Sequence, residues 1–89
     1  MQYLLIEHTF DTDSFMYYDS YIAYTSEATA INDAEERLKD YLDTGEFDIV
    51  QYIPTSKNKV FPYSVMIEGN KGKFDGERIL IEVRKIYSF

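Results

Sequence analysis

TSEATAINDAEERLKDYLDTG, residues 25–45, is the stretch that decides the fold of this chain. Its apolar side chains recur every three or four positions, a spacing that gathers them on one stripe of an α-helix. Thr25 or Ser26 can cap the start of this helix, Glu27 in its first turn complements the helix dipole, and Gly45 marks its end. The stripe that we expect to face a core comprises Ile31, Ala34, Leu38, Tyr41 and Leu42.

Stretches rich in β-branched and aromatic residues flank the helix on both sides and predict strands. The polar turn at residues 11–14 is too short for a parallel crossover, so the first two strands should form an antiparallel hairpin. The loop GNKGKFDG, residues 69–76, should join the last two strands, with Gly69, Gly72 and Gly76 supplying positive φ angles. The predicted strands are residues 2–10, 15–25, 47–53, 63–68 and 77–87.

The order strand, strand, helix, strand, strand, strand predicts an α+β fold: a small, mostly antiparallel sheet with one amphipathic helix packed on one face. The chain has 89 residues and shows no internal repeat or linker, so we expect residues 1–89 to form a single domain. The sheet face away from the helix should be exposed. Tyr17 and Tyr21 would lie on it if Tyr18 and Ile22 point inward, and the sequence leaves that register open.

Negative charge is concentrated in the N-terminal part of the chain. Twelve of the sixteen acidic residues lie in the first fifty positions, where Arg37 and Lys39 alone oppose them, so this part carries about −10. The remaining residues carry about +3, which leaves the net charge of −7. Such asymmetry within one small domain indicates an electrostatic partner.

The helix has an acidic stripe opposite its apolar one. Asp33, Glu36, Asp40 and Asp43 fall on this stripe, with successive carboxylates about 5 to 6 Å apart. This spacing is close to that of phosphates along a nucleic-acid strand, so the stripe can mimic nucleic-acid charge and occupy a basic groove of another protein. The alternative interpretation is a charged helix surface that only keeps the protein in solution. Further residues should contribute to a partner-binding surface. We expect negative charge from Glu35, Glu46 and Asp48, and contact area from Tyr17 and Tyr21.

Composition excludes several classes of protein. There is no cysteine, which removes disulfides and thiolate zinc sites. A hydrophobic content of 45% and fifteen aromatic residues argue for a folded chain despite its acidity. The N-terminus has no basic segment typical of a signal peptide, and no stretch approaches the length of a membrane span. We therefore expect a cytoplasmic protein that does not bind membranes.

No motif for catalysis, metal or a cofactor is complete. Gly72 and Lys73 are followed by Phe74, where a Walker loop needs Ser or Thr. Asp11, Asp13 and Asp19 do not fit an EF-hand, since Phe15 and Met16 occupy the positions of a ligand and the conserved glycine. His8 is the single histidine, and a lone strand histidine is usually structural. We expect no enzymatic activity, no metal and no cofactor.

The function that the sequence favours is that of a small acidic binding protein, an inhibitor or modulator that covers the basic, nucleic-acid-binding surface of a larger protein. Phage and mobile-element anti-defence proteins are of this kind, and the link to them is an analogy. The alternative is an assembly module that forms a homo-oligomer through a sheet edge. Direct nucleic-acid binding through Lys57, Lys59, Lys71 and Lys73 is disfavoured by the net charge.

Overall fold

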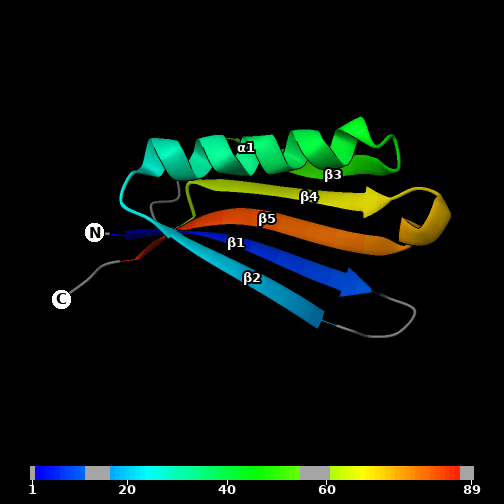
Figure 1. Cartoon of the computed structure of the whole chain (residues 1–89), viewed down its shortest axis with the longest axis horizontal. Helices are drawn as coiled ribbons and strands as arrows, with labels where there is room; N and C mark the ends of the chain where they lie inside the picture. The colour runs from blue at the N-terminus through cyan, green and yellow to red at the C-terminus, as the bar shows by residue number, and fades with distance from the viewer. Residues whose placement is uncertain (1, 12–16, 55–60, 87–89) are drawn as a thin grey trace.

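The computed structural model describes residues 2–11, 17–54 and 61–86 (Figure 1). The ends of two predicted strands, at Phe15, Met16 and Tyr87, lie outside these residues. The predicted α+β class and the order of its elements are confirmed. The elements are β1 (Gln2–Asp11), β2 (Tyr17–Tyr24), α1 (Glu27–Asp43), β3 (Phe47–Ile53), β4 (Tyr63–Gly69), the short 3-10 helix η1 (Gly72–Phe74) and β5 (Glu77–Ile86).

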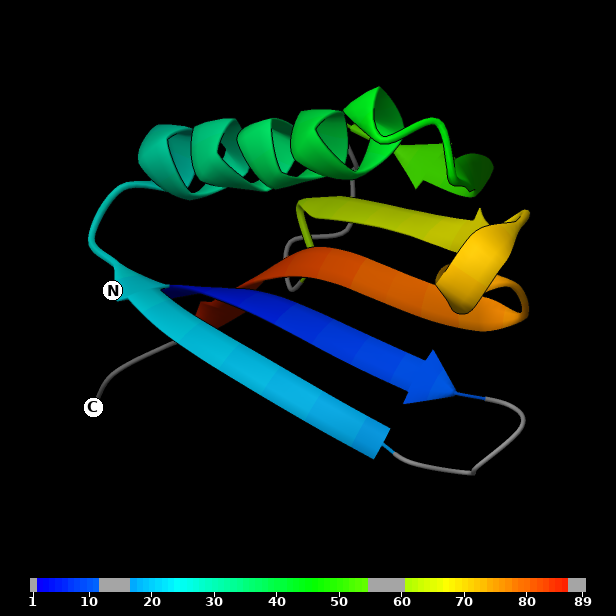
Figure 2. The same ribbon diagram turned by 45° about the vertical axis from the view of Figure 1, so that its right-hand side comes forward.

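The five strands form one antiparallel sheet in the order β2-β1-β5-β4-β3. The centre of the sheet is β5, which pairs with β1 on one side and with β4 on the other. The two strands that flank α1 in the sequence, β2 and β3, are the two edges. Figures 1 and 2 show α1 lying over one face of this sheet; no described helix covers the opposite face, which we call the open face.

The ends of α1 follow the predicted caps. The Ser26 hydroxyl accepts a hydrogen bond from the backbone N–H of Thr29 at 3.3 Å, which satisfies one of the free donors of the first turn. At the other end Thr44 is the C-cap, and Gly45 follows with a positive φ of 74° that a residue with a side chain adopts at a cost. Within the described residues, no helix combines the length and the apolar character needed to cross a membrane.

The apolar stripe of α1 agrees with the prediction in part, since Ala34 and Leu38 face the core as expected. Ala30, Ala34 and Leu38 are buried, whereas Ile31 and Leu42 are half-buried and pack at the margin of the core. Alanine has the smallest side chain that keeps good helix propensity, so Ala30 and Ala34 let the helix backbone approach the sheet closely. The bulkier Ile31 and Leu42 are displaced to the flank.

The core lies between α1 and the covered sheet face. In β5, Ile79, Ile81 and Val83 are buried as predicted. They stand directly opposite Ile67, Val65 and Tyr63 of β4, which are fully buried as well. Alternate residues along the two strands therefore fill one layer, as expected for a sheet covered on one face only.

The pairing of β1 with β2 fixes the register that the sequence leaves open. Ile22 stands opposite Leu5, whose side chain is 1% exposed in the core. Ile22 is therefore on the helix side of the sheet, and Tyr21 points to the open face. Tyr21 is 58% exposed there.

Two of the three glycines at the β4–β5 loop have the positive φ angles that the sequence predicts, and the third does not. Gly72 and Gly76 have positive φ angles of 68° and 84°. The prediction is wrong for Gly69, which ends β4. A Cβ atom at Gly69 would lie 1.7 Å from the carbonyl oxygen of Phe74, so glycine is needed for the close approach of η1.

Replacing Gly69 with Ala should therefore lower the free energy of unfolding by about 3 kcal/mol or more, because backbone of η1 must move. Gly45→Ala is the matched control, since its Cβ would meet nothing within 4 Å and only the positive φ is penalised, at about 1 to 2 kcal/mol. Urea denaturation of both variants measures the difference. Equal losses in the two variants would contradict the close contact at Gly69.

Candidate functional site

The outward side of α1 carries an acidic surface made of Glu36, Asp40 and Asp43, which we call the outer acidic face. All three residues are exposed. Their spacing of three and four residues puts successive carboxylates on the same side of the helix, as predicted. Among the ion pairs of the described residues, none involves these three carboxylates.

The sequence predicts Asp33 on the same acidic stripe, but the structure places it on the flank of α1 that faces β2. It is half-buried, and its carboxylate accepts a hydrogen bond from the Tyr24 hydroxyl. That hydrogen bond, together with burial, raises the pKa of Tyr24 above its usual value of 10.0. Asp33 therefore joins the helix to an edge strand and is not part of the outer acidic face.

Glu35 makes the corresponding contact on the opposite flank of the helix. Its Oε1 accepts a hydrogen bond from the Tyr52 hydroxyl of β3 at 2.6 Å. The same hydrogen bond is the largest cause of the raised pKa of Tyr52. Each edge strand of the sheet is thus tied to α1 by a tyrosine that donates to a helix carboxylate.

A third carboxylate, Glu7 of β1, is enclosed between the sheet and the helix. Its side chain is 13% exposed, and its two oxygens accept from Arg37 Nη1 at 3.0 Å and from the Tyr41 hydroxyl at 2.5 Å. Burial, followed by the hydrogen bond to Glu7, raises the pKa of Tyr41 well above its usual value of 10.0. Because Arg37 is directed to Glu7, it does not neutralise the outer acidic face.

A groove of about 530 Å³ lies beside this network. Tyr41, Phe47 and Phe74 supply its aromatic lining, with the rings of Tyr41 and Phe47 packed edge to face at 5.2 Å. Asp40 of the outer acidic face lies at the same groove. The groove is thus continuous with the acidic surface and adds apolar contact area to it.

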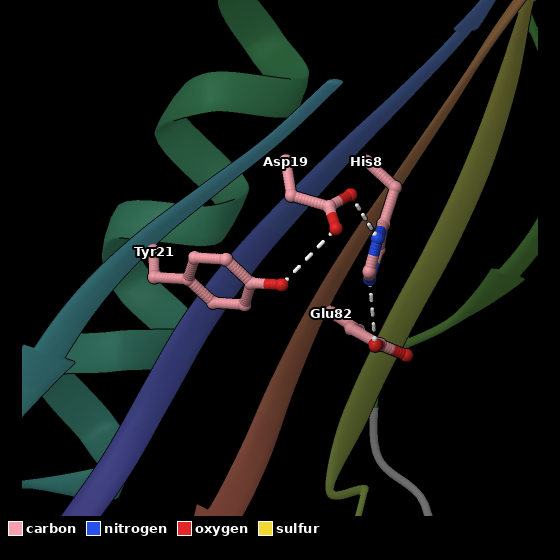
Figure 3. Close-up of polar contacts among 4 residues, drawn as sticks. All are labelled: His8, Asp19, Tyr21 and Glu82. Carbon is pink, nitrogen blue, oxygen red and sulfur yellow. Dashed lines mark hydrogen bonds and ion pairs between the residues drawn. The ribbon is translucent and has the colours of Figure 1, made fainter. Parts of the chain in front are cut away.

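On the open sheet face, His8 of β1 lies between two carboxylates (Figure 3). Its Nδ1 is 2.6 Å from Asp19 Oδ1 of β2, and its Nε2 is 3.1 Å from Glu82 Oε1 of β5. The Tyr21 hydroxyl donates to the second oxygen of Asp19 at 3.0 Å. The imidazole therefore bridges a carboxylate of each neighbouring strand, with one ring nitrogen facing each of them.

This cluster connects three strands and leaves little room for acid–base chemistry. The side chains of His8, Asp19 and Glu82 are only 18%, 24% and 16% exposed. A histidine that acts as a general base needs a nitrogen with a free lone pair, and both nitrogens of His8 face carboxylates. The arrangement fits a structural ion cluster that fixes β2 to β1 and β5.

The remaining predicted site residues do not join the outer acidic face. Glu46 is half-buried against Gly72 of the β4–β5 loop, and Asp48 is exposed on β3 opposite Glu68. Tyr21 is engaged with Asp19. For Tyr17 the structure describes the backbone, opposite Phe10, and its side chain lies outside the described part of the chain.

Of the four lysines considered for nucleic-acid binding, the structure describes two. Lys57 and Lys59 lie outside the described residues, and Lys71 and Lys73 are exposed in the β4–β5 loop. The ammonium group of Lys73 lies 4.8 Å from the centre of the Phe74 ring, a cation–π contact within the loop itself.

Comparison with known proteins adds no relative. No family model, no curated protein and no solved structure matches this chain.

Sequence reasoning missed two of the polar networks. The Glu7 network has a sequence signal, because Glu7 shares a strand face with Leu5 and must find partners there. Arg37 and Tyr41, one helical turn apart, can supply them. The His8 cluster has no such signal. Asp19 and Glu82 come together only because β1 lies between β2 and β5, and the sequence does not specify that strand order.

Replacing His8 with Leu should lower the free energy of unfolding by about 1 to 3 kcal/mol, because Asp19 and Glu82 are left partly buried without the imidazole that both contact. The variant His8→Leu, Asp19→Asn, Glu82→Gln removes the charges as well and should recover part of this loss. Urea denaturation measures both. A triple variant no more stable than His8→Leu would contradict the role of His8 as the shared partner of these two carboxylates.

Alkaline pH should destabilise the protein through Tyr41. Above about pH 10 the unfolded chain releases the Tyr41 proton while the folded chain retains it, so stability falls as pH rises, by up to about 1.4 kcal/mol per pH unit. Tyr41→Phe should reduce the slope of unfolding free energy against pH between pH 10 and 12. An unchanged slope in this variant would show that Tyr41 does not retain its proton.

Proposed function

We propose that this chain is a non-enzymatic binding protein whose outer acidic face covers a basic surface of a larger protein. The observation that carries the proposal is the division of the carboxylates into two groups. Glu7, Asp33 and Glu35 are hydrogen-bonded to partners in the chain itself. Glu36, Asp40 and Asp43 are exposed, and the described residues contain no ion pair to them.

This arrangement has an energetic cost that a partner can offset. Like charges three or four residues apart on a helix each cost a few tenths of a kcal/mol. The helix carries six carboxylates against Arg37 and Lys39, and Arg37 is engaged with Glu7. The resulting negative field is directed away from the sheet, where it can steer a basic protein into contact.

A basic surface that ordinarily binds nucleic acid is the partner that we propose. The spacing of about 5 to 6 Å between successive carboxylates resembles that between phosphates. Bound there, the chain would act as an inhibitor or modulator in the cytoplasm, in the manner of phage and mobile-element anti-defence proteins. The nearby groove, with Asp40 at its margin, adds aromatic contact area to the acidic surface.

A second candidate function, assembly through a sheet edge, has an observation of its own. Both edge strands expose apolar residues, among them Ile22 of β2 and Ile49 and Val50 of β3. An assembly module would form dimers or larger species as concentration rises, which light scattering detects. Charge reversal on the outer acidic face would leave that assembly intact.

The variant Glu36→Lys, Asp40→Lys tests the first proposal in a pull-down from a lysate of the native host, with washes of increasing salt and quantification by mass spectrometry. The wild-type chain should retain a basic protein that is released as salt rises, and the variant should lose it. Glu27→Lys, Asp75→Lys is the matched control, since both residues are exposed and the net charge changes equally. Retention by the first variant, or binding that does not weaken with salt, would refute the proposal.

A further inference from the structure

Among the described residues, the edge strand β3 has a strand partner on one side only. It is the last strand of the sheet and pairs with β4 alone, so no strand of the described chain occupies its other side. Backbone N–H and C=O groups on an open edge can form a ladder with another extended segment. An edge strand is usually protected by short length or by charge, and β3 has seven residues with one charged side chain, Asp48.

The apolar side chains of β3 are unusually exposed to solvent. Only Phe47 is buried, and the six residues after it are all exposed. Four of these six are apolar or aromatic, with exposed fractions of 44% for Ile49, 51% for Val50, 42% for Tyr52 and 37% for Ile53. Four exposed apolar residues on one edge strand, interrupted only by Gln51, indicate an interaction surface, whereas single exposed apolar residues do not.

A β-bulge sorts these residues between the two faces of the sheet. The ladder with β4 runs from Ile49 opposite Ile67 to Gln51 opposite Met66, which leaves Val50 as the extra residue. Ile49 and Tyr52 are therefore on the helix side, and Ile53 is on the open face. An added strand would find apolar neighbours on both of its faces.

The flank of α1 above this edge is acidic. Glu35 accepts a hydrogen bond from Tyr52 of β3. Together with Ile31 and Asn32, it also lines a shallow hollow of about 520 Å³. On the opposite face of the sheet, Asp48 adds a carboxylate at the start of the strand, beside Glu68 of β4. The side chains of an added strand that face the helix would meet apolar contact at Ile31 and negative charge at Glu35.

We propose that the open edge of β3 binds an extended, basic segment of the partner protein by strand addition. The basic character of that segment rests on the proposed function, and the edge itself supplies the backbone ladder. A second copy of this chain is the less favourable occupant. Antiparallel pairing of two β3 strands would bring two α1 helices, each with six carboxylates and two cations, to the same face of a joined sheet.

A synthetic peptide of alternating lysine and valine, capped at both ends, tests the edge without the natural partner. Its binding is followed by amide chemical shifts of the isotope-labelled protein. Saturable shifts should appear along β3 and at Ile31, Asn32 and Glu35. The same peptide with alternate backbone nitrogens methylated cannot donate to a ladder and should not bind, and a peptide of glutamate and valine should bind far more weakly.

Two protein variants make the test specific to β3. Val50→Lys puts a positive charge on the edge and should weaken peptide binding about tenfold or more. Ala23→Lys makes the same charge change on the other edge strand, where Ala23 is exposed, and should change affinity much less. Equal effects of the two variants, or equal binding of the methylated peptide, would overturn the proposal.

Two further outcomes separate this inference from its alternatives. Peptide shifts confined to Glu36, Asp40 and Asp43 would overturn strand addition and would leave the proposed function intact. If the variant Glu36→Lys, Asp40→Lys still binds the peptide at β3, and binding still requires the backbone donors, strand addition is supported. This holds even if that variant also retains the partner in the pull-down, which would refute the proposed function. A concentration-dependent dimer of the protein alone that Val50→Lys abolishes would identify a second copy as the occupant and would overturn the proposal.

Discussion

Ala30, Ala34 and Leu38 press one side of α1 against the covered face of the sheet, and this contact sets the orientation of every other helix residue. With the two alanines inward, Arg37 is directed to Glu7 of β1 and Glu35 to Tyr52 of β3. Glu36 and Asp40 are left pointing to solvent. A rotation of the helix by one residue, about 100°, would bury a carboxylate and would break the hydrogen bonds that Tyr24 and Tyr52 donate to the helix. The small core residues therefore determine the electrostatic surface.

The acidic residues of this chain consequently serve two different purposes. One group satisfies tyrosine and arginine donors at the margin of the core, where an unpaired donor or acceptor would cost free energy. The other group is exposed on α1 and has no ion pair to any residue that the structure describes. Net charge alone does not distinguish the two groups, because each contributes equally to the total of −7. The hydrogen-bond partners separate the two groups.

The sequence predicts the elements of this fold well and their lateral arrangement poorly. The period of the helix, its Ser26 cap and the alternation of Ile79, Ile81 and Val83 are local signals, and the structure agrees with them. The strand order, the bulge at Val50 and the meeting of His8 with Glu82 depend on contacts between distant parts of the chain. Asp33 shows the same limit within the helix. Its helical angle is close to that of Glu36, but the nearby Tyr24 hydroxyl gives it a structural partner.

The position of β5 at the centre of the sheet has a consequence for how the chain acquires its structure. β1 and β5 pair along their whole length, although Gln2–Asp11 and Glu77–Ile86 are separated by most of the sequence. During synthesis the β1–β2 hairpin and α1 emerge first, and their apolar faces must wait for the last strand before the core can close. Closing so large a loop costs entropy before any contact compensates for it, which favours slow folding. The nascent chain therefore exposes Leu5 and Leu38 until β5 has emerged, and until then it can bind chaperones.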